Sequence, residues 1–148
     1  AKEQEEADYI APVVLACMNM ARKKTGALIA IQGTSDLTPY QHAGERFLAA
    51  VNARLIETIF FKNSPLHDGA MIIAGGKICA AGCILPVASD TDLNKDLGLR
   101  HRSALGLSQK TDAKIISEER GTISLAYRSE IIVDITPDEL RALLSSED

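Results

Sequence analysis

The chain has 148 residues, of which 46% are hydrophobic and 24% charged, and its formal net charge is −4 at pH 7. This is the length of a single domain, which buries roughly 68–70% of the surface that its unfolded chain exposes, and no apolar run approaches the ~20 residues of a membrane-spanning helix, so we expect the chain itself to be soluble. The net negative charge excludes broad nucleic-acid binding, which depends on many lysines and arginines that neutralise phosphates.

The first part of the chain predicts two helices separated by a buried strand. Apolar residues recur at helical spacing over residues 4–24 and again over residues 45–61. Residues 27–31 form a short apolar run between glycines, which is typical of a strand covered on both faces. Residues 33–44 are predicted to form a loop.

A hairpin and a third helix follow. The apolar runs 70–74 and 77–81 flank Gly75-Gly76, a pair that favours the positive φ angles of a tight turn. Residues 86–96 are polar and irregular, and residues 100–110 have apolar positions at helical spacing.

The last part of the chain predicts strands and one more helix. Three strands are expected at residues 114–117, 122–127 and 130–134. Thr136, Pro137 and Glu139 supply an N-cap, a first-turn proline and the glutamate of a capping box, which predicts a helix through residue 144. Together the elements predict an α/β fold (α+β mixed), a single globular domain with a mixed central β-sheet flanked by helices.

The three cysteines are Cys17, Cys79 and Cys83, an odd number without the paired spacing of a zinc site. We interpret them as small apolar core residues in a reducing compartment, not as a disulfide framework or a metal site.

Arg100, His101 and Arg102 stand at the start of a predicted helix. A helix N-terminus has free N–H groups and the positive end of the dipole, so two arginines oppose the helix unless an anion lies there. A phosphate group would satisfy the N–H donors and the guanidinium groups together. A solvated basic patch is the alternative interpretation.

Two acidic groupings lie at the ends of predicted strands. His67-Asp68-Gly69 is either an ordinary turn or a site in which Asp68 binds Mg²⁺ or Mn²⁺, His67 assists, and Gly69 lets a substrate approach the backbone. Glu118-Glu119 is either a solvated pair at a turn or a second carboxylate for the same cation.

In combination, carboxylates for a divalent cation beside an arginine-lined helix end favour nucleotidyl or phosphoryl transfer. Neither a phosphate-binding P-loop nor a Rossmann glycine fingerprint is present. A metal phosphohydrolase with an adjacent His-Asp pair is a further interpretation, although only His42 and His101 remain as additional histidine ligands.

Residues 63–121 resemble the diadenylate cyclase domain. The resemblance rests on three segments in this order: NSPLHDGAMII, LGLRHRSALGLS and SEERG. That family condenses two ATP molecules into cyclic di-AMP and releases two pyrophosphates. ARKKTGALIAI, from Ala21, is similar to the membrane-anchored branch of the family. The resemblance implies that residues 1–148 are the catalytic domain, that transmembrane helices precede it in the full-length protein, and that it lies at the cytoplasmic side of the cell membrane.

The resemblance also implies roles for the DGA motif and its neighbours. Asp68 would bind the catalytic Mg²⁺ or Mn²⁺ and help to deprotonate the attacking 3′-hydroxyl, and His67 and Glu119 would be further metal ligands. Gly69 and Ala70 would lie along the nucleotide.

For ATP, the resemblance implies that Arg100, His101 and Arg102 hold the triphosphate and that Ser117 contacts a phosphate. The chain departs from the family at two positions, with Leu99 where threonine is common and Ile84 where some members have a tyrosine that stacks on adenine. Apolar packing from Ile84 and Leu85 would hold adenine instead.

The reaction implied by the resemblance needs two facing subunits, because each 3′-hydroxyl attacks the α-phosphate of the opposite ATP. We therefore expect a head-to-head homodimer. Two other classes remain open: a degenerate nucleotide-binding module without catalysis, and a metal-dependent phosphohydrolase. The charged residues 1–9 form either a solvated helix face or a surface for a regulatory protein.

Overall fold

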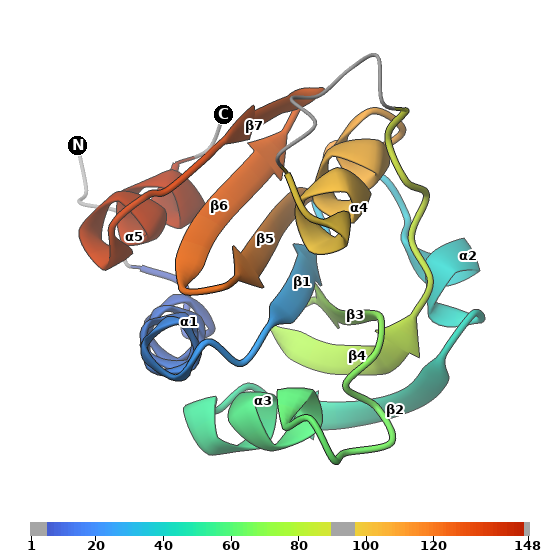
Figure 1. The fold of residues 1–148 in the computed structure, drawn as a ribbon. Coiled ribbons are helices and arrows are strands. Elements are labelled where there is room, and N and C mark those ends of the chain that lie inside the picture. The colour runs from blue at the N-terminus through green and yellow to red at the C-terminus, as the bar shows by residue number, and fades with distance from the viewer. Residues whose placement is uncertain (1–5, 90–96, 147–148) are drawn as a thin grey trace, which may run out of the picture.

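A computed structural model describes residues 6–89 and 97–146, which are organised around one mixed β-sheet. Its strands are β1 (Ala27–Ile31), β2 (Glu45–Ala50), β3 (Ala70–Ala74), β4 (Lys77–Cys83), β5 (Lys114–Glu119), β6 (Thr122–Tyr127) and β7 (Glu130–Ile132). They lie side by side in the order β2-β4-β3-β1-β5-β6-β7 (Figure 1). β1 and β3 are parallel, and the other neighbouring strands are antiparallel.

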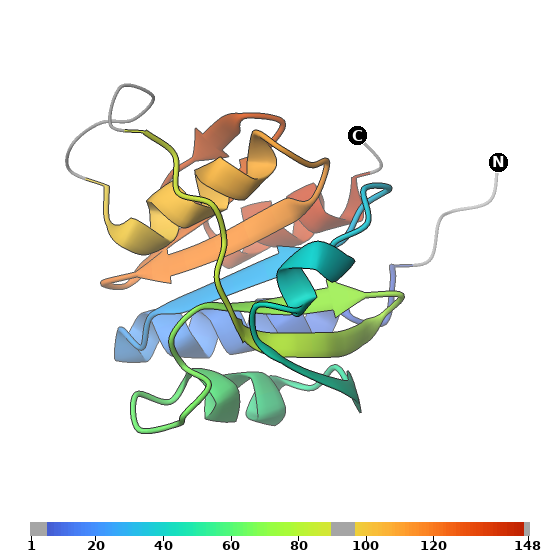
Figure 2. The same ribbon diagram turned by 90° about the vertical axis from the view of Figure 1, so that its right-hand side faces the viewer.

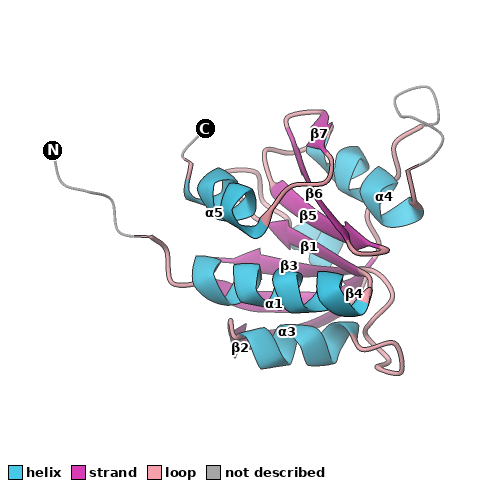
Figure 3. Cartoon of the chain, turned by 60° about the vertical axis from the view of Figure 1, so that its left-hand side comes forward, coloured by secondary structure: helices cyan, strands magenta, loops and turns pink. Residues whose placement is uncertain are grey.

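Helices cover both faces of the sheet. α1 (Ile10–Lys23), α3 (Ala53–Phe60) and α5 (Pro137–Ser145) lie together on one face (Figure 3). α4 (Leu99–Ser108) and the short α2 (Thr38–Gln41) lie on the other face (Figure 2). This three-layer arrangement confirms the predicted α/β class. None of the helices in the described ranges is long and apolar enough to cross a membrane.

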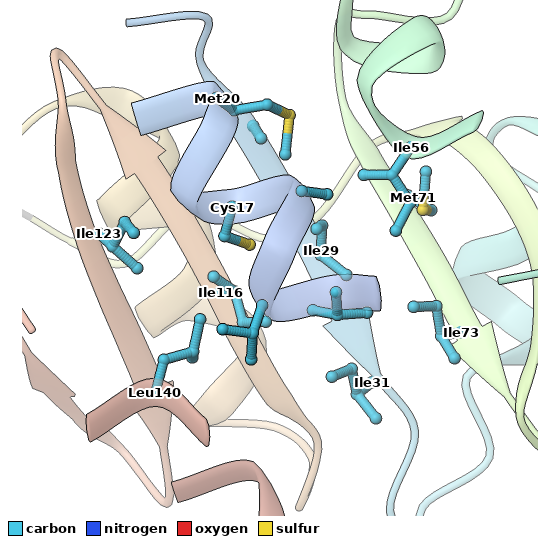
Figure 4. Packing of buried hydrophobic residues seen from close by; sticks show 14 of the residues in the cluster. Cys17, Met20, Ile29, Ile31, Ile56, Met71, Ile73, Ile116, Ile123 and Leu140 are labelled. Atoms are coloured by element: carbon cyan, nitrogen blue, oxygen red, sulfur yellow. The ribbon is translucent and has the colours of Figure 1, made fainter. Parts of the chain in front are cut away.

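Two apolar cores fill the spaces between these layers. The larger lies under α1, where Cys17 and Met20 face the isoleucines of the central strands (Figure 4). Burial raises the pKa of the Cys17 thiol to about 12, with a further contribution from the nearby Glu118, and burial raises that of Cys83 to about 11. Both cysteines are free and buried, which confirms that they are core residues, whereas Cys79 is partly exposed.

The helix predicted for residues 45–61 is wrong in its first half, which forms the edge strand β2. Phe47 and Ala49 alternate with exposed residues and pack against the core, as strand periodicity requires. Leu48, which fitted the helical spacing, is exposed. Asn52 then caps α3, because its side chain accepts a hydrogen bond from the Leu55 N–H at 2.8 Å.

Other predicted elements differ at their ends. The first helix begins at Ile10 and not near residue 4, because residues 6–9 are not helical, while residues 4 and 5 lie outside the described ranges. The predicted loop 33–44 contains α2, and the strand expected to reach residue 134 ends at Ile132. The capping box of α5 is confirmed, with both reciprocal hydrogen bonds of Thr136 and Glu139 present.

The chain leaves β4 as an extended segment, residues 84–89, that passes close to α4 (Figure 2). The Ala88 N–H donates to the Arg102 carbonyl at 3.0 Å, although that carbonyl belongs to the helix. A Cβ on Gly106 would stand only 2.0 Å from the Pro86 carbonyl oxygen. The absence of a side chain at Gly106 therefore lets the segment approach the helix and sets the position of Leu85.

This contact gives opposite expectations for Gly106→Ala. Helix propensity alone predicts stabilisation by about 1 kcal/mol, but the added methyl group would overlap Pro86, and overpacking typically costs about 1–3 kcal/mol. We expect the clash to dominate and the free energy of unfolding in urea to fall. An unchanged or raised value would show that the segment can move away without cost.

Candidate functional site

The two motifs singled out in the sequence meet at a cavity of about 350 Å³. Its walls come from the start of β1, the start of β3, the end of β4 with the segment that follows, and the first turn of α4. Asp68 and Gly69 of the first motif line this cavity, and so does Arg100 of the second motif. Leu85 adds an apolar surface. Because β1 and β3 are parallel neighbours, both strands start at the same end of the sheet.

Gly69 is a position that only glycine can occupy. Its φ is +100°, and a Cβ there would lie 2.7 Å from the Cys83 carbonyl oxygen and 2.8 Å from the carbonyl carbon of Gly82. The close approach of the two backbones places Asp68 at the mouth of the cavity, where its side chain is 88% exposed.

His67 is oriented toward Asp68. Its Nδ1 lies 2.8 Å from the Ser64 carbonyl oxygen, which can only accept, so Nδ1 holds the proton. Nε2 lies 3.2 Å from Asp68 Oδ1, so the protonated ring would form an ion pair with that carboxylate, whereas the neutral ring presents an Nε2 lone pair beside it. Two lone-pair atoms at this separation suit a shared cation, and the carbonyl on Nδ1 is the support that metal-binding histidines commonly have.

These two side chains do not form a complete metal site. Within residues 6–89 and 97–146, no group of three or more His, Cys, Asp or Glu side chains is arranged to hold a metal ion. Mg²⁺ is usually held by one or two carboxylates and completes its shell with water and substrate phosphates. The donor set therefore fits a divalent cation that arrives with a phosphorylated substrate.

Arg100 lies between a glycine and a carboxylate. The guanidinium packs on Gly26, where a Cβ would be 2.7 Å from Arg100 Cζ, and Arg100 Nη1 donates to Glu119 Oε1 at 3.1 Å. The Glu119 carboxylate also lies against Gly98, the N-cap of α4, whose first turn has no acidic residue of its own. Glu119 thus supplies negative charge at the positive end of the helix, and Arg100 is not part of a solvated patch.

Arg102 is half-buried on the same turn, and its Nε donates to the Leu97 carbonyl at 3.3 Å. Glu119 and His101 border a neighbouring hollow of about 620 Å³, whereas Asp68 and Arg100 border the cavity described above. The two carboxylates proposed for one cation, Asp68 and Glu119, are therefore not brought together at a single cavity in this structure.

His101 and Ser117 lie behind the cavity wall. The His101 side chain is only 4% exposed, its Nδ1 lies 2.5 Å from the Ser117 hydroxyl, and its Nε2 lies 3.3 Å from the Ser124 hydroxyl. Ser117 and Ser124 face each other on β5 and β6. Burial lowers the pKa of His101, and the nearby Glu119 carboxylate opposes that shift. The imidazole thus binds α4 to the sheet as a neutral group.

Sequence reasoning did not identify Ser124. Its signal was a polar residue among the buried positions 123–126 of β6, whose other members are apolar.

The interpretation of Glu118-Glu119 as a solvated pair is wrong for Glu118, which is completely buried. Its carboxylate accepts hydrogen bonds from Gly26 N at 2.6 Å and Gly121 N at 2.8 Å. Adjacent strand residues point to opposite faces, so Glu119 lies with Arg100 and α4 while Glu118 lies on the face covered by α1.

Comparison with known proteins places these features in a family. The family model for DisA bacterial checkpoint controller nucleotide-binding (DAC) matches residues 14–131. A diadenylate cyclase of Listeria monocytogenes is 37% identical over 147 residues, and the cyclic di-AMP synthase CdaA of Bacillus subtilis is 35% identical over the same length; each match covers 98% of this chain and 54% of the relative. The chain thus spans about half the length of these relatives.

Solved structures agree with the fold. A double mutant of DacA from Staphylococcus aureus has a TM-score of 0.88 and 37% identity, with 92% of both chains covered. A hypothetical membrane spanning protein from Bacillus cereus has a TM-score of 0.82 and 33% identity, with 88% of this chain and 65% of the other covered. The sequence resemblance and the predicted mixed fold are both confirmed.

The buried His101 predicts a pH dependence of stability. Its folded-state pKa lies below the ordinary 6.5, so as the pH falls below about 6.5 the unfolded chain binds a proton that the folded protein does not. The neutral His101 therefore makes its full contribution to the free energy of unfolding above about pH 6.5. This contribution is lost as the pH falls toward the folded-state pKa of His101. We expect the free energy of unfolding to fall between about pH 7.5 and 5, with a smaller slope in His101→Gln.

Asp112 does not confuse this measurement. Hydrogen bonds from Thr34 and Ser35 lower its pKa, so its effect has the same sign but appears only below its ordinary 3.8. An identical slope in wild type and His101→Gln would contradict the assignment of a neutral buried imidazole.

Proposed function

The chain belongs to the DisA bacterial checkpoint controller nucleotide-binding family, and on this premise we propose that it is the catalytic domain of a diadenylate cyclase, which condenses two ATP molecules into cyclic di-AMP and two pyrophosphates. The main support is the meeting of Asp68 and Arg100 at one cavity. This cavity combines an exposed carboxylate, which has the His67 imidazole beside it, with a guanidinium, and such groups suit a nucleotidyl transfer from ATP.

ATP would lie along the start of β3, where Gly69 borders the cavity and Ala70 follows it in the chain. Arg100 and Arg102 at the start of α4 would bind the triphosphate through charge-assisted hydrogen bonds. Ile84 and Leu85 would contact adenine, since both border the cavity.

His101 and Ser117 have a different part in this proposal. Their polar atoms bond to each other behind the wall, so they would hold the arginine-bearing turn in place while the arginines contact phosphate. The apolar Leu99 stands beside Arg100 at the cavity border.

Mg²⁺ or Mn²⁺ would be held by Asp68 and His67 together with phosphate oxygens of ATP. A divalent cation supplies charge neutralisation at the phosphates and lowers the pKa of a hydroxyl bound to it. Asp68 would also accept the proton of the 3′-hydroxyl, because an ionised carboxylate at the cavity mouth has acceptor capacity directed toward solvent. Glu119 would become available to a second cation or a phosphate-bound water only after it leaves Arg100.

The active form would be a head-to-head homodimer. A single cavity holds one nucleotide, and each 3′-hydroxyl must reach the α-phosphate of the other ATP in line with its pyrophosphate. Three apolar side chains at the cavity border, Ile84, Val87 and Leu99, are between 52% and 74% exposed. A facing copy would cover these side chains and exclude water from both nucleotides.

We also propose that the domain works within a longer protein attached to a membrane at its cytoplasmic side. The matched Listeria and Bacillus relatives are about twice its length, and one similar structure is described as a membrane spanning protein.

The function is tested by incubating the purified chain with ATP and Mn²⁺ or Mg²⁺ and resolving the nucleotides by chromatography. We expect cyclic di-AMP and pyrophosphate. In Asp68→Asn the rate should fall by at least about 100-fold, since removal of a proton acceptor costs about 10²–10⁴ in rate, while Asp138→Asn on the exposed face of α5 serves as the control with wild-type activity. ATP that is bound but left intact would indicate a degenerate module, and ADP or AMP without a cyclic product would indicate a phosphohydrolase.

The dimer is tested by the dependence of rate on protein concentration. For a weak dimer the rate per mole of chain should rise with concentration, and Val87→Asp should shift this rise to higher concentration because two like charges would meet across the two-fold axis. Leu48→Asp is the control, since Leu48 is also an apolar, exposed residue but lies on the edge strand β2. A rate per mole of chain that does not change with concentration in the wild type and in both variants, together with sedimentation as a monomer, would contradict the dimer.

A further inference from the structure

The completely buried Glu118 carboxylate has no part in the reaction proposed above. It lies under α1, on the face of the sheet opposite to Arg100 and near the Cys17 thiol. A buried carboxylate is costly unless its oxygens are hydrogen-bonded. Here each oxygen accepts one backbone N–H, Oε1 from Gly26 at 2.6 Å and Oε2 from Gly121 at 2.8 Å.

The two donors are glycines in a backbone conformation that other residues rarely adopt. Gly26 joins the end of α1 to β1 with φ +85°, and Gly121 forms the turn between β5 and β6 with φ +88°. In the described part of the chain, the N–H groups of Gly26 and Gly121 have no hydrogen-bond partner other than Glu118. The carboxylate therefore ties the start of β1 to the β5–β6 turn.

One tied segment contacts Arg100 directly, and the other directly follows a residue that does. Gly26 is the surface on which the guanidinium rests, with Cζ 2.7 Å from the position that a Cβ would take. The β5–β6 turn begins directly after Glu119, whose carboxylate accepts from Arg100 Nη1 at 3.1 Å. Arg100 thus contacts Gly26 on one side and Glu119 on the other, and the buried Glu118 carboxylate bonds to Gly26 and to the turn that follows Glu119.

We propose that Glu118 is a positioning residue for ATP binding: by holding Gly26 and the β5–β6 turn from beneath the sheet, it fixes the orientation of the Arg100 guanidinium at the cavity. The proposal rests on the function proposed above, in which Arg100 binds the triphosphate. Glu118 acts through Arg100 and does not touch the nucleotide.

The test is the affinity for a non-hydrolysable ATP analogue with Mn²⁺, measured by calorimetry in wild type and in Glu118→Gln. Glutamine has the same size, but its amide nitrogen cannot accept, so one of the two N–H groups loses its partner. We expect the affinity to fall about tenfold. In the Arg100→Ala background, the same substitution should change the affinity by less than about twofold, because the residue through which Glu118 acts is gone.

A purely structural role would give a different pattern. It would lower the melting temperature and leave the affinity unchanged at a temperature where the variant is folded. Ile123→Val is the matched control: Ile123 is the cross-strand neighbour of Glu118 in the same core, so the variant should lose stability while its affinity stays within about twofold of wild type.

A second variant keeps the proposal falsifiable if Glu118→Gln does not fold. Gly26→Ala leaves the carboxylate in place but puts a methyl group where the flexible end of Arg100 lies. It should weaken binding, and the loss should again disappear in the Arg100→Ala background. Unchanged affinity in Gly26→Ala, or equal losses with and without Arg100, would overturn the proposal.

The outcome for the proposed function is read separately. A wild-type chain that binds the analogue but forms no cyclic di-AMP from ATP would overturn the cyclase and leave the role of Glu118 to be judged by affinity. A cyclase whose affinity is insensitive to Glu118→Gln would overturn the positioning role alone. A wild-type chain that binds no ATP analogue would overturn both.

Discussion

The attachment of α4 to the sheet through His101 is the interaction on which the site depends. A helix that starts with two arginines and no acidic residue is poorly capped by its own sequence. The buried contacts from His101 to Ser117 and Ser124 hold its first turn, and Glu119 supplies the missing negative charge. The turn can therefore hold Arg100 at the cavity without relying on a bound anion to form the helix.

Successive side chains of β5 point to opposite faces of the sheet, so its three consecutive polar residues have partners on both faces. Ser117 and Glu119 point to the α4 face, where one anchors His101 and the other pairs with Arg100. Glu118 points to the α1 face and binds backbone N–H groups beneath the site. A short polar run at the end of a central strand thus forms hydrogen bonds on both faces of the sheet, with α4 on one face and with backbone N–H groups on the other.

The sequence predicted what local periodicity and turn chemistry determine, including the 75–76 hairpin and the capping box of α5. It failed where two elements happened to share one spacing: Leu48 and Leu55 fit a single helix, but Asn52 between them is an N-cap that ends the strand and starts α3. Asp68 and Arg100 were recognised from their motifs. They meet because Arg100 packs on Gly26 before β1, Asp68 precedes β3, and β1 and β3 are parallel neighbours.

The buried partners were harder to predict because their roles depend on tertiary contacts. Ser124 looks like an ordinary strand residue until β6 is paired with β5 and α4 is placed above it. Glu118 looks solvated beside Glu119 and Arg120 until α1 covers it. In both cases the local signal was a polar residue at an inward strand position, and only the opposite element shows what it binds.

In the proposed cyclase, the exposure of Asp68 gives a reason why one subunit would not be sufficient for catalysis. Its carboxylate lies at the mouth of the cavity in contact with water, where charge interactions are weak and a triphosphate is strongly hydrated. The apolar Ile84, Val87 and Leu99 border the same mouth. If a second copy closes over them, it delivers the other nucleotide and removes water in a single step, so that electrostatic stabilisation becomes strong only when both substrates are present.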